Sequence, residues 1–345
     1  MTYCHPLFVF YYFRSPMGRH SLLLSASSTG VPVITRPLTS LRAIKIPLPP
    51  LSEQHAIAHI LGTLDDKIEL NRQMNKTLES IAQALFKSWF VDFDPVRARM
   101  EGRQPYDMDA ETAALFPDSF DDSALGEIPR GWRTGKVSDV SEVTDFVANG
   151  SFESLRKNVQ YLNDPDYAIL VRLVDFNNGW RGNYVYVSEP AFSFLKKSSL
   201  ELDDVVIANV GAPGTVFKVP NLGRPMTLGP NAVVVRPKEF IGISKQYLYY
   251  HFLSLEGQQK LQSIISGSAQ PKFNKTDMRA LDIIIPSREA LIHFDNLTKA
   301  IWAYQSIIHN ESGTLVNIRD LLLPKLLSGE IRVKDAEKSV EARAS

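Results

Sequence analysis

The chain carries the stretch Leu41-Arg-Ala-Ile-Lys-Ile-Pro-Leu-Pro49 and, 237 residues later, the matching stretch Met278-Arg-Ala-Leu-Asp-Ile-Ile-Ile-Pro286. The match continues without a gap for about 45 further residues. Each copy has the pattern of a short β-rich segment that ends at proline and leads into a long helix. Ser52 and Ser287 stand where the N-cap of that helix is expected. An internal repeat of this length indicates two copies of one structural unit.

The two helices that follow share their apolar positions. Steps of three and four residues alternate along both, which is the spacing of a coiled coil. Each helix is expected to run about 35–40 residues, or about 50–60 Å, and its stripe needs a partner. The seam positions are Ile57, Ile60, Leu64, Leu78, Ile81 and Leu85 in the first helix, and Phe294, Leu297, Ile301, Ile308, Leu315, Ile318 and Leu322 in the second.

Matched stripes favour packing of the two helices on each other, although each helix could instead cover a separate core. Lys67, Asn71 and Glu311 interrupt the seam with polar side chains. Polar seam residues fix the register of a coiled coil at some cost in stability. They could equally mark a place where the helices separate.

The repeat extends upstream of both helices. Tyr11-Tyr-Phe-Arg-Ser15-Pro-Met-Gly18 is similar to Tyr250-His-Phe-Leu-Ser254-Leu-Glu-Gly257, at an offset of 239 residues. Each copy then runs as a helix into a turn, Ser27-Ser-Thr-Gly30 or Ser266-Gly-Ser268. The first copy begins at the last helix of a unit whose second copy is complete. We therefore expect the chain to be truncated at its N-terminus.

Between the helices the pattern changes twice. Residues 93–127 are rich in Asp, Pro and small residues, and we expect a mostly irregular linker. The alternative, an acidic metal site, is disfavoured because no EF-hand spacing is present. From 128 to 285, short β-type runs such as Asp204–Ala208 and Ala232–Arg236 alternate with Gly, Asn and Pro, and a helix returns around 244–265. This pattern predicts a compact β-rich domain.

The charge of the β-rich domain is mild, with 18 basic and 15 acidic residues between 128 and 285. Its basic residues cluster with polar and glycine neighbours, which suits contacts to DNA phosphates and base edges, although charged loop residues are commonly just solvated. The candidate DNA contacts are Gln270, Lys272, Asn274 and Lys275 in a loop near the end of the domain, followed by Arg156, Lys157, Arg181 and Lys218.

The sequence contains no motif that supports nucleotide binding, metal binding or catalysis. Gly131-Trp-Arg-Thr-Gly135-Lys136-Val137 is one residue short of a P-loop and lacks its Ser/Thr. His55 and His59 have helical spacing for a zinc pair but no third ligand nearby, so we expect neither a catalytic nor a metal site. The single cysteine, Cys4, excludes a disulfide framework. No apolar run is long enough to span a bilayer, and we expect a cytoplasmic protein.

Four motifs together resemble those of one family, the specificity subunits of type I restriction-modification systems, over nearly the whole chain. They are Ile46-Pro-Leu-Pro-Pro-Leu-Ser-Glu-Gln54 before the first helix, Ala84-Leu-Phe-Lys-Ser-Trp-Phe-Val-Asp-Phe-Asp-Pro95 at its end, Ile128-Pro-Arg-Gly-Trp132 at the start of the β-rich domain, and Leu321-Leu-Leu-Pro-Lys-Leu-Leu-Ser-Gly-Glu-Ile331 at the end of the second helix.

The resemblance implies an α+β fold, in which a β-rich target-recognition domain accompanies two long conserved helices that form an antiparallel coiled coil. It also implies six segments. They are the C-terminal remnant of a first recognition domain (1–45), the first spacer helix (46–92), a linker (93–127), the second recognition domain (128–285), the second spacer helix (286–331) and a polar tail (332–345).

The resemblance further implies a non-catalytic subunit that reads one half of a split site in double-stranded DNA. Its partners are methyltransferase (modification) subunits and restriction-translocase subunits, and S-adenosylmethionine, ATP and Mg²⁺ belong to those partners. Because one recognition domain is missing, a homodimer is a further expectation. The alternative is a coiled-coil scaffold whose β-rich domain binds protein or carbohydrate.

Overall fold

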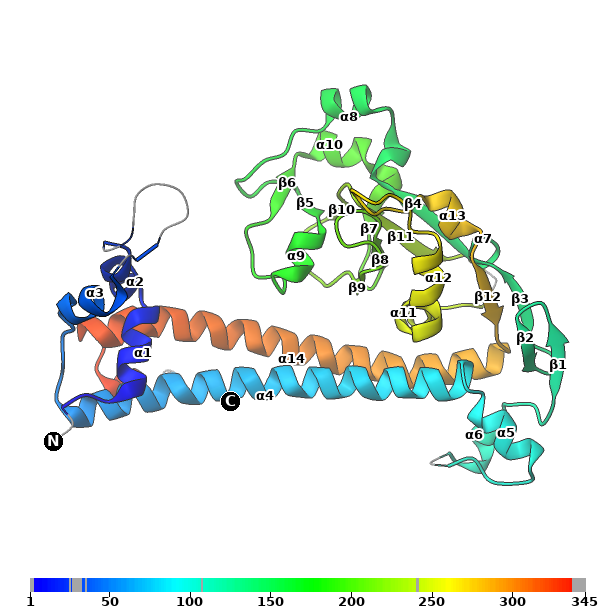
Figure 1. Cartoon of the computed structure of the whole chain (residues 1–345), viewed down its shortest axis with the longest axis horizontal. Helices are drawn as coiled ribbons and strands as arrows, with labels where there is room; N and C mark the ends of the chain where they lie inside the picture. Colours follow the sequence, from blue (N-terminus) through cyan, green and yellow to red (C-terminus); the bar gives the residue numbers. More distant parts are fainter. Residues whose placement is uncertain are drawn as a thin grey trace. The chain divides into compact units, whose positions relative to one another are not determined.

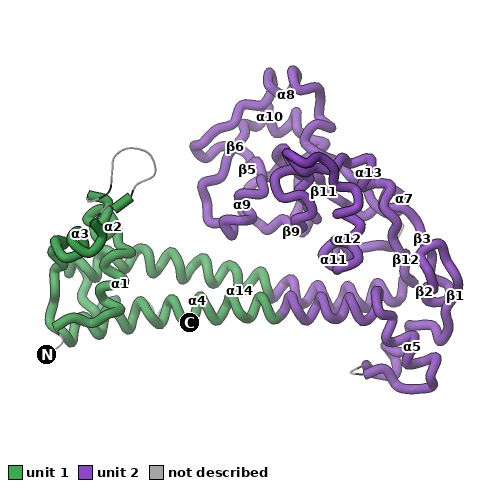
Figure 2. The backbone as a smooth tube through the Cα atoms, viewed as in Figure 1, with its two compact units in different colours: residues 1–77, 305–345 green, residues 78–304 purple. Residues whose placement is uncertain are grey.

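The computed structural model describes residues 3–24, 26, 33–34, 36–106, 108–239 and 242–336. The chain divides into two compact units (Figure 2). Unit 1 contains residues 1–77 and 305–345, and unit 2 contains residues 78–304. The expected turn at 27–30 and the end of the polar tail, from 337 onward, lie outside the described residues. Within the described part, no helix combines the length and the apolar character that crossing a membrane requires.

Unit 1 is helical. Its helices are α1 (Pro6–Arg14), α2 (Pro16–Leu23), α3 (Pro37–Ala43), the first part of α4 (Leu51–Phe90) and the last part of α14 (Arg288–Ser328). Phe8 and Tyr11 of α1 join residues of both long helices in one core. This core buries the seam residues Ile57, Ile60, Leu64, Leu315, Ile318 and Leu322, and Ile308 is also buried.

Helices α4 and α14 pack together in an antiparallel pair (Figure 1). Three polar contacts within unit 1 follow this direction, because partners farther along α4 lie earlier in α14. They join Asp65 to Arg319 (2.7 Å), Asn71 to Glu311 (2.8 Å) and the Asn75 carbonyl to Gln305 (3.3 Å). The fold class that the sequence predicts is confirmed.

The polar seam residues of unit 1 contact one another. The Asn71 side chain is fully buried and donates from Nδ2 to Glu311 Oε2, and Lys67 Nζ lies 3.4 Å from Glu311 Oε1. The helices therefore do not separate at this point. A buried amide needs a partner at one position of the opposite helix, so this contact favours a single register.

In unit 2 the predicted seam differs from the buried one. Ile81 and Leu297 are exposed (52% and 42%), and Leu78, Leu85 and Ile301 are half-buried. Phe294 is buried as expected, and the residues one position after four of the predicted seam positions are buried as well: Ala82, Phe86, Thr298 and Trp302. An α-helix has 3.6 residues per turn, so its apolar face drifts relative to a 3.5-residue seam. Here the drift turns both helices toward the β-rich domain of the same unit.

The upstream repeat is a helix-serine-helix corner in both units. Ser15 Oγ accepts from the Gly18 amide between α1 and α2, and Ser254 Oγ accepts from the Gly257 amide between α11 (Lys245–Leu253) and α12 (Leu255–Ser263). A Cβ on Gly18 or Gly257 would lie 2.0 or 1.9 Å from a carbonyl oxygen of the preceding helix. The single helix expected around 244–265 is therefore two helices.

The first copy of the opening pattern forms no strand. Residues 44–50 have no regular structure after α3, whereas the second copy forms β12 (Asp282–Ile285). Strand β12 pairs antiparallel with β3 (Arg133–Lys136), and no strand that the structure describes pairs with residues 44–50. A strand needs a hydrogen-bonding neighbour, so the same sequence pattern gives different local structure in the two copies.

Unit 2 contains two four-stranded sheets, with strand orders β6-β5-β10-β7 and β4-β11-β8-β9, and two strand pairs, β1-β2 and β12-β3. Helix α11 and the two large sheets lie in one domain (Figure 1). The remaining strands are β1 (Phe120–Ser123), β2 (Gly126–Pro129), β4 (Ser141–Asp145), β5 (Ala168–Val171), β6 (Val185–Val187), β7 (Ser199–Leu200), β8 (Val205–Ala208), β9 (Val216–Lys218), β10 (Met226–Leu228) and β11 (Ala232–Pro237).

Short helices connect these strands. They are α7 (Val137–Val140), the 3₁₀-helix η1 (Phe146–Asn149), α8 (Phe152–Asn158), α9 (Leu173–Asn177), α10 (Glu189–Phe194), the 3₁₀-helix η2 (Lys196–Ser198) and α13 (Lys275–Arg279).

Strands β8 and β11 are buried on both faces, which explains their unbroken apolar runs. Alternate residues enter different clusters. Val205 and Val235 join the cluster that contains Phe86 and Tyr247, whereas Val206 and Val234 join the cluster around Phe217. The sheet thus has helices of the same unit on one face and the second sheet's residues on the other.

The segment 93–127 contains more structure than the expected linker. Helix α5 spans Asp94–Met100, α6 spans Ala110–Ala113, and β1 begins at Phe120. Val96 and Phe116 are buried in the same cluster as Trp132, whose ring lies 5.8 Å from those of Phe90 and Phe93. Burial of these apolar side chains orders a segment whose composition alone predicts irregular structure.

Candidate nucleic-acid interface

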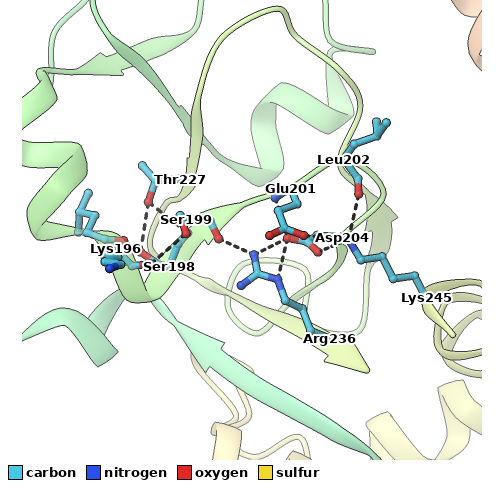
Figure 3. Close-up of polar contacts among 10 residues, drawn as sticks. Lys196, Ser198, Ser199, Glu201, Leu202, Asp204, Thr227, Arg236 and Lys245 are labelled. Atoms are coloured by element: carbon cyan, nitrogen blue, oxygen red, sulfur yellow. Dashed lines mark hydrogen bonds and ion pairs between the residues drawn. The ribbon is translucent and has the colours of Figure 1, made fainter. Parts of the chain in front are cut away.

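A buried charge network organises the centre of the β-rich domain (Figure 3). The Asp204 side chain is fully buried before β8 and accepts from Arg236 Nε of β11 at 2.9 Å. Lys245 Nζ of α11 lies 2.8 Å from its other oxygen, and the Glu201 amide donates at 2.8 Å. Arg236 also donates to the Ser199 carbonyl. The network therefore fixes the turn between β7 and β8.

The protonation states within this network follow from its contacts. Burial alone raises the pKa of the Asp204 carboxyl, but the hydrogen bonds from Arg236, Lys245 and the Glu201 backbone outweigh burial and hold the pKa below its ordinary value. Asp204 is thus ionised at neutral pH and neutralises two cations of the domain. Arg236 and Lys245 serve the interior of the domain, so neither is a good candidate for a DNA contact.

Other cations of unit 2 also have partners inside the chain. Four further ion pairs join Lys136 to Asp282, Arg172 to Asp175, Lys260 to Glu256 and Lys275 to Asp145. Among the residues that the structure describes in this domain, eight exposed cations form no side-chain hydrogen bond or ion pair within the chain: Arg130, Arg133, Arg156, Lys157, Arg181, Lys196, Lys197 and Lys272. Arg224 and Arg279 are also exposed, but they donate to the backbone carbonyls of Asp166 and Val143.

Four of these exposed cations lie on neighbouring elements. Arg156 and Lys157 end α8, and Lys196 and Lys197 form η2. Helix η1 contacts both α8 and η2. Asn149 at the end of η1 holds η2 by donating to Ser198 Oγ (2.8 Å) and accepting from the Lys197 amide (2.9 Å). We call the four cations the basic end.

The sequence singles out Arg156 and Lys157 but misses Lys196 and Lys197. The missed signal is the adjacent lysine pair Lys196-Lys197, which is followed by Ser198 and Ser199. Its exposure depends on the packing of η2, in which Leu195 and Ser198 are buried while both lysines face solvent.

In the loop of residues 270–275, near the end of the domain, some of the predicted DNA contacts are free and others have partners within the chain. Gln270 and Lys272 are exposed, and the backbone of Lys272 exchanges two hydrogen bonds with Ser266. Asn274, by contrast, caps α13 by accepting from the Asp277 amide at 2.9 Å. Lys275 Nζ is bound by Asp145 at 2.9 Å. Two of the four predicted contacts thus have structural partners.

Asp145 connects this loop to the basic end. The same Oδ1 atom that binds Lys275 accepts from the Ala148 amide and caps η1. The exposed loop residues therefore attach to the element that carries Asn149 and holds η2. The loop and the basic end are parts of one region of the domain.

Lys218 does not lie where a DNA contact is expected. It belongs to β9 and is half-buried, with Nζ 4.2 Å from the ring centre of Trp302 in α14 and 5.9 Å from that of Tyr249. Burial lowers the pKa of Lys218 to about 8, although the nearby carboxylates of Glu79 and Asp203 act against that shift. The position supports packing of β9 on α14 within unit 2. A DNA contact by Lys218 stays a prediction, and its contacts inside the chain make it a weaker candidate than the exposed cations.

In the described ranges, no three His, Cys, Asp or Glu side chains come together as a possible metal site. His55 and His59 are both exposed, and the ring of His55 lies 4.3 Å from that of His5. The chemically relevant feature of the domain is a set of exposed cations, while many of its other charged side chains form ion pairs or hydrogen bonds within the chain. This arrangement suits binding of a polyanion.

Comparison with known proteins gives a consistent result. A family model described as "Type I restriction modification DNA specificity domain" matches residues 7–80 and 129–317. The HindI type I restriction enzyme specificity subunit of Haemophilus influenzae is 29% identical over 358 residues, covering 90% of this chain and 73% of that protein. The MjaIX specificity subunit of Methanocaldococcus jannaschii is 26% identical over 304 residues, covering 86% of this chain and 63% of that protein.

Among solved structures, the type I restriction-modification S subunit from M. genitalium is similar in fold, with a TM-score of 0.54 and 16% identity. The match covers 93% of this chain and 72% of that one. The chain thus spans roughly two thirds to three quarters of the length of these relatives.

Proposed function

The chain belongs to the family of type I restriction-modification DNA specificity subunits, and we propose that its β-rich domain reads one half-site of a split DNA sequence. The observation that carries this proposal is that unit 2 has two groups of cations, those bound within the chain and those left free. Most cations are bound by carboxylates or carbonyls of the same unit, whereas those of the basic end and Lys272 are exposed and free. Free cations on a near-neutral domain are suited to phosphate contacts.

In this proposal the chain does no chemistry. Methyl transfer with S-adenosylmethionine and DNA translocation with ATP and Mg²⁺ belong to methyltransferase and restriction subunits that assemble with it in the cytoplasm. The α4–α14 pair acts as the spacer that separates reading elements. The polar contact between Asn71 and Glu311 supports a fixed register for that spacer.

The test is DNA binding by the full chain assembled with its methyltransferase subunits, measured at several salt concentrations. If four to six cations contact phosphates, the logarithm of the affinity should fall with the logarithm of salt with a slope of about −4 to −5. Absence of salt-dependent DNA binding would contradict the proposal and would instead favour a scaffold whose β-rich domain binds protein or carbohydrate.

A homodimer belongs to the same proposal, because two copies would present two identical readers to a symmetric site. Light scattering of the complex with and without DNA tests it. One specificity chain per DNA-bound complex, on a site that is fully recognised, contradicts the homodimer but leaves DNA reading itself intact.

A further inference from the structure

A constrained loop carries the exposed cation Arg181. Residues 178–184 connect α9 to β6, and four of them have left-handed backbone angles: Gly179 (φ +65°), Trp180 (+60°), Gly182 (+89°) and Asn183 (+58°). This region is open to glycine and accessible to asparagine, but it costs a bulky residue such as tryptophan free energy. The surrounding structure must therefore hold Trp180 in place.

The anchors of this loop are internal. The Trp180 ring lies 6.2 Å from Phe176 and 5.9 Å from Phe217, in the apolar cluster between the two large sheets. Tyr184 donates from its hydroxyl to the Trp180 carbonyl at 2.6 Å. The loop is thus fixed from inside by aromatic packing and a hydrogen bond.

A buried ion pair fixes the other side of the loop. Arg172 binds Asp175, whose side chain is 2% exposed, and also donates to the Asn183 carbonyl at 3.2 Å. The Trp180 amide donates to the Asp175 carbonyl at 2.9 Å. Packing and hydrogen bonds therefore restrain the backbone on both sides of residue 181.

Arg181 itself is exposed, and no hydrogen bond or ion pair joins it to another described residue. Exposed amides of Asn178 and Asn183 flank it. The contrast is with Arg156 and Lys157, which are also exposed but end a seven-residue helix on the basic end. Phosphates tolerate variable cation positions, whereas a base edge requires a donor pair in one position.

We propose that Arg181 determines sequence specificity by donating two hydrogen bonds to the O6 and N7 atoms of a guanine, while Arg156 and Lys157 contact phosphates. This inference rests on the proposed function and assigns roles within it. Arginine is the side chain whose planar donors match those two acceptors. The constrained backbone reduces the ordering that recognition would otherwise require.

The experiment selects DNA from a library with randomised positions, using the full chain assembled with its methyltransferase subunits. Arg181→Ala should lower the preference for guanine at one position about 10- to 100-fold and leave preferences at the other positions unchanged. Arg181→Lys should restore only part of it, because the lysine ammonium can reach these acceptors but lacks the planar pair of donors. The double variant Arg156→Ala/Lys157→Ala should keep every preference but bind all sequences more weakly, with a salt slope smaller in magnitude by about 2.

Two results overturn the inference. One is that Arg181→Ala weakens binding to all sequences equally and reduces the salt slope by about 1, which is the behaviour of a phosphate contact. The other is that Arg181→Ala changes neither quantity. Failure of the unaltered complex to bind DNA in a salt-dependent way overturns the proposed function as well, so the two failures are distinguishable. An unchanged tryptophan emission spectrum of the Arg181 variants shows that the loop is still folded.

Discussion

Replacing Asp204 by asparagine tests the buried charge network directly. The change keeps the shape of the side chain but removes the charge that binds Arg236 and Lys245. An amide also turns an NH₂ group toward one of these two donors. Removing one partner of a buried ion pair costs about 3–5 kcal/mol. Arg236 and Lys245 are each 25% exposed and recover some hydration, so we expect the low end of that range, about 3 kcal/mol.

The assay is urea unfolding followed by tryptophan fluorescence. All four tryptophans lie in unit 2, so the signal reports this unit and not unit 1. The matched control is Asp203→Asn. Burial raises the pKa of Asp203, and its φ of +62° is accessible to asparagine, so the free energy of unfolding should change by less than about 0.5 kcal/mol.

The pH dependence gives an independent check. Because the folded-state pKa of Asp204 is depressed, its contribution is complete above the ordinary aspartate pKa of about 4 and is lost as pH falls through the lower folded value. The stability difference between the unaltered chain and Asp204→Asn should be constant from pH 7 to 5 and shrink below about pH 4. A difference under about 1 kcal/mol at pH 7, or one that grows on acidification, would show that the Asp204 carboxylate does not stabilise the fold through Arg236 and Lys245.

Three further predictions concern other parts of the chain. Glu311→Ala should destabilise unit 1 by about 1–2 kcal/mol, because it removes the acceptor of the buried Asn71 amide. Glu311→Gln should destabilise unit 1 less. Hydrogen exchange of residues 60–77 measures both effects. Gly257→Ala should lower the free energy of unfolding of unit 2 by about 1–3 kcal/mol, because the new Cβ would meet a backbone oxygen. Gly313→Ala lies in open helical surroundings and should raise the free energy of unfolding of unit 1 by about 0.5–1 kcal/mol. Urea unfolding measures both, and a Gly257→Ala variant that is more stable than the unaltered chain contradicts the first prediction. Burial, with Lys260 nearby, lowers the pKa of His251 to about 3, so unit 2 should lose stability as pH falls from about 6.5 toward 3, and His251→Phe should remove that part of the slope.

The long helices show which buried positions can be predicted from apolar periodicity and which cannot. In unit 1 the predicted seam positions Ile57, Ile60 and Leu64 are buried, because the α4–α14 contact is the main one there. In unit 2 the same spacing places Ile81 and Leu297 in solvent. Heptad spacing describes a helix with one partner. It does not describe a helix that also packs against a sheet domain.

Which basic residues are free to bind a ligand is harder to predict from the sequence than which helix positions are buried. Lys275 and Asp145 are 130 positions apart, and Asp204 and Arg236 are 32 apart. Whether a lysine in a loop is free for a ligand depends on such distant partners, and composition cannot reveal them. For the same reason Lys218, a plausible DNA contact in the sequence, lies over the ring of Trp302.

The family, the two long helices and the repeat that relates them can all be predicted from the order of residues, because they depend on local spacing. The corner residues Ser15, Gly18, Ser254 and Gly257, for example, act within a few positions of one another. The folded chain is needed to know which seam residues are buried, whether the repeated segment forms a strand, and which cations are free of partners within the chain. Those properties depend on partners brought together by folding, and the free energy of a strand or an ion pair belongs to both partners at once.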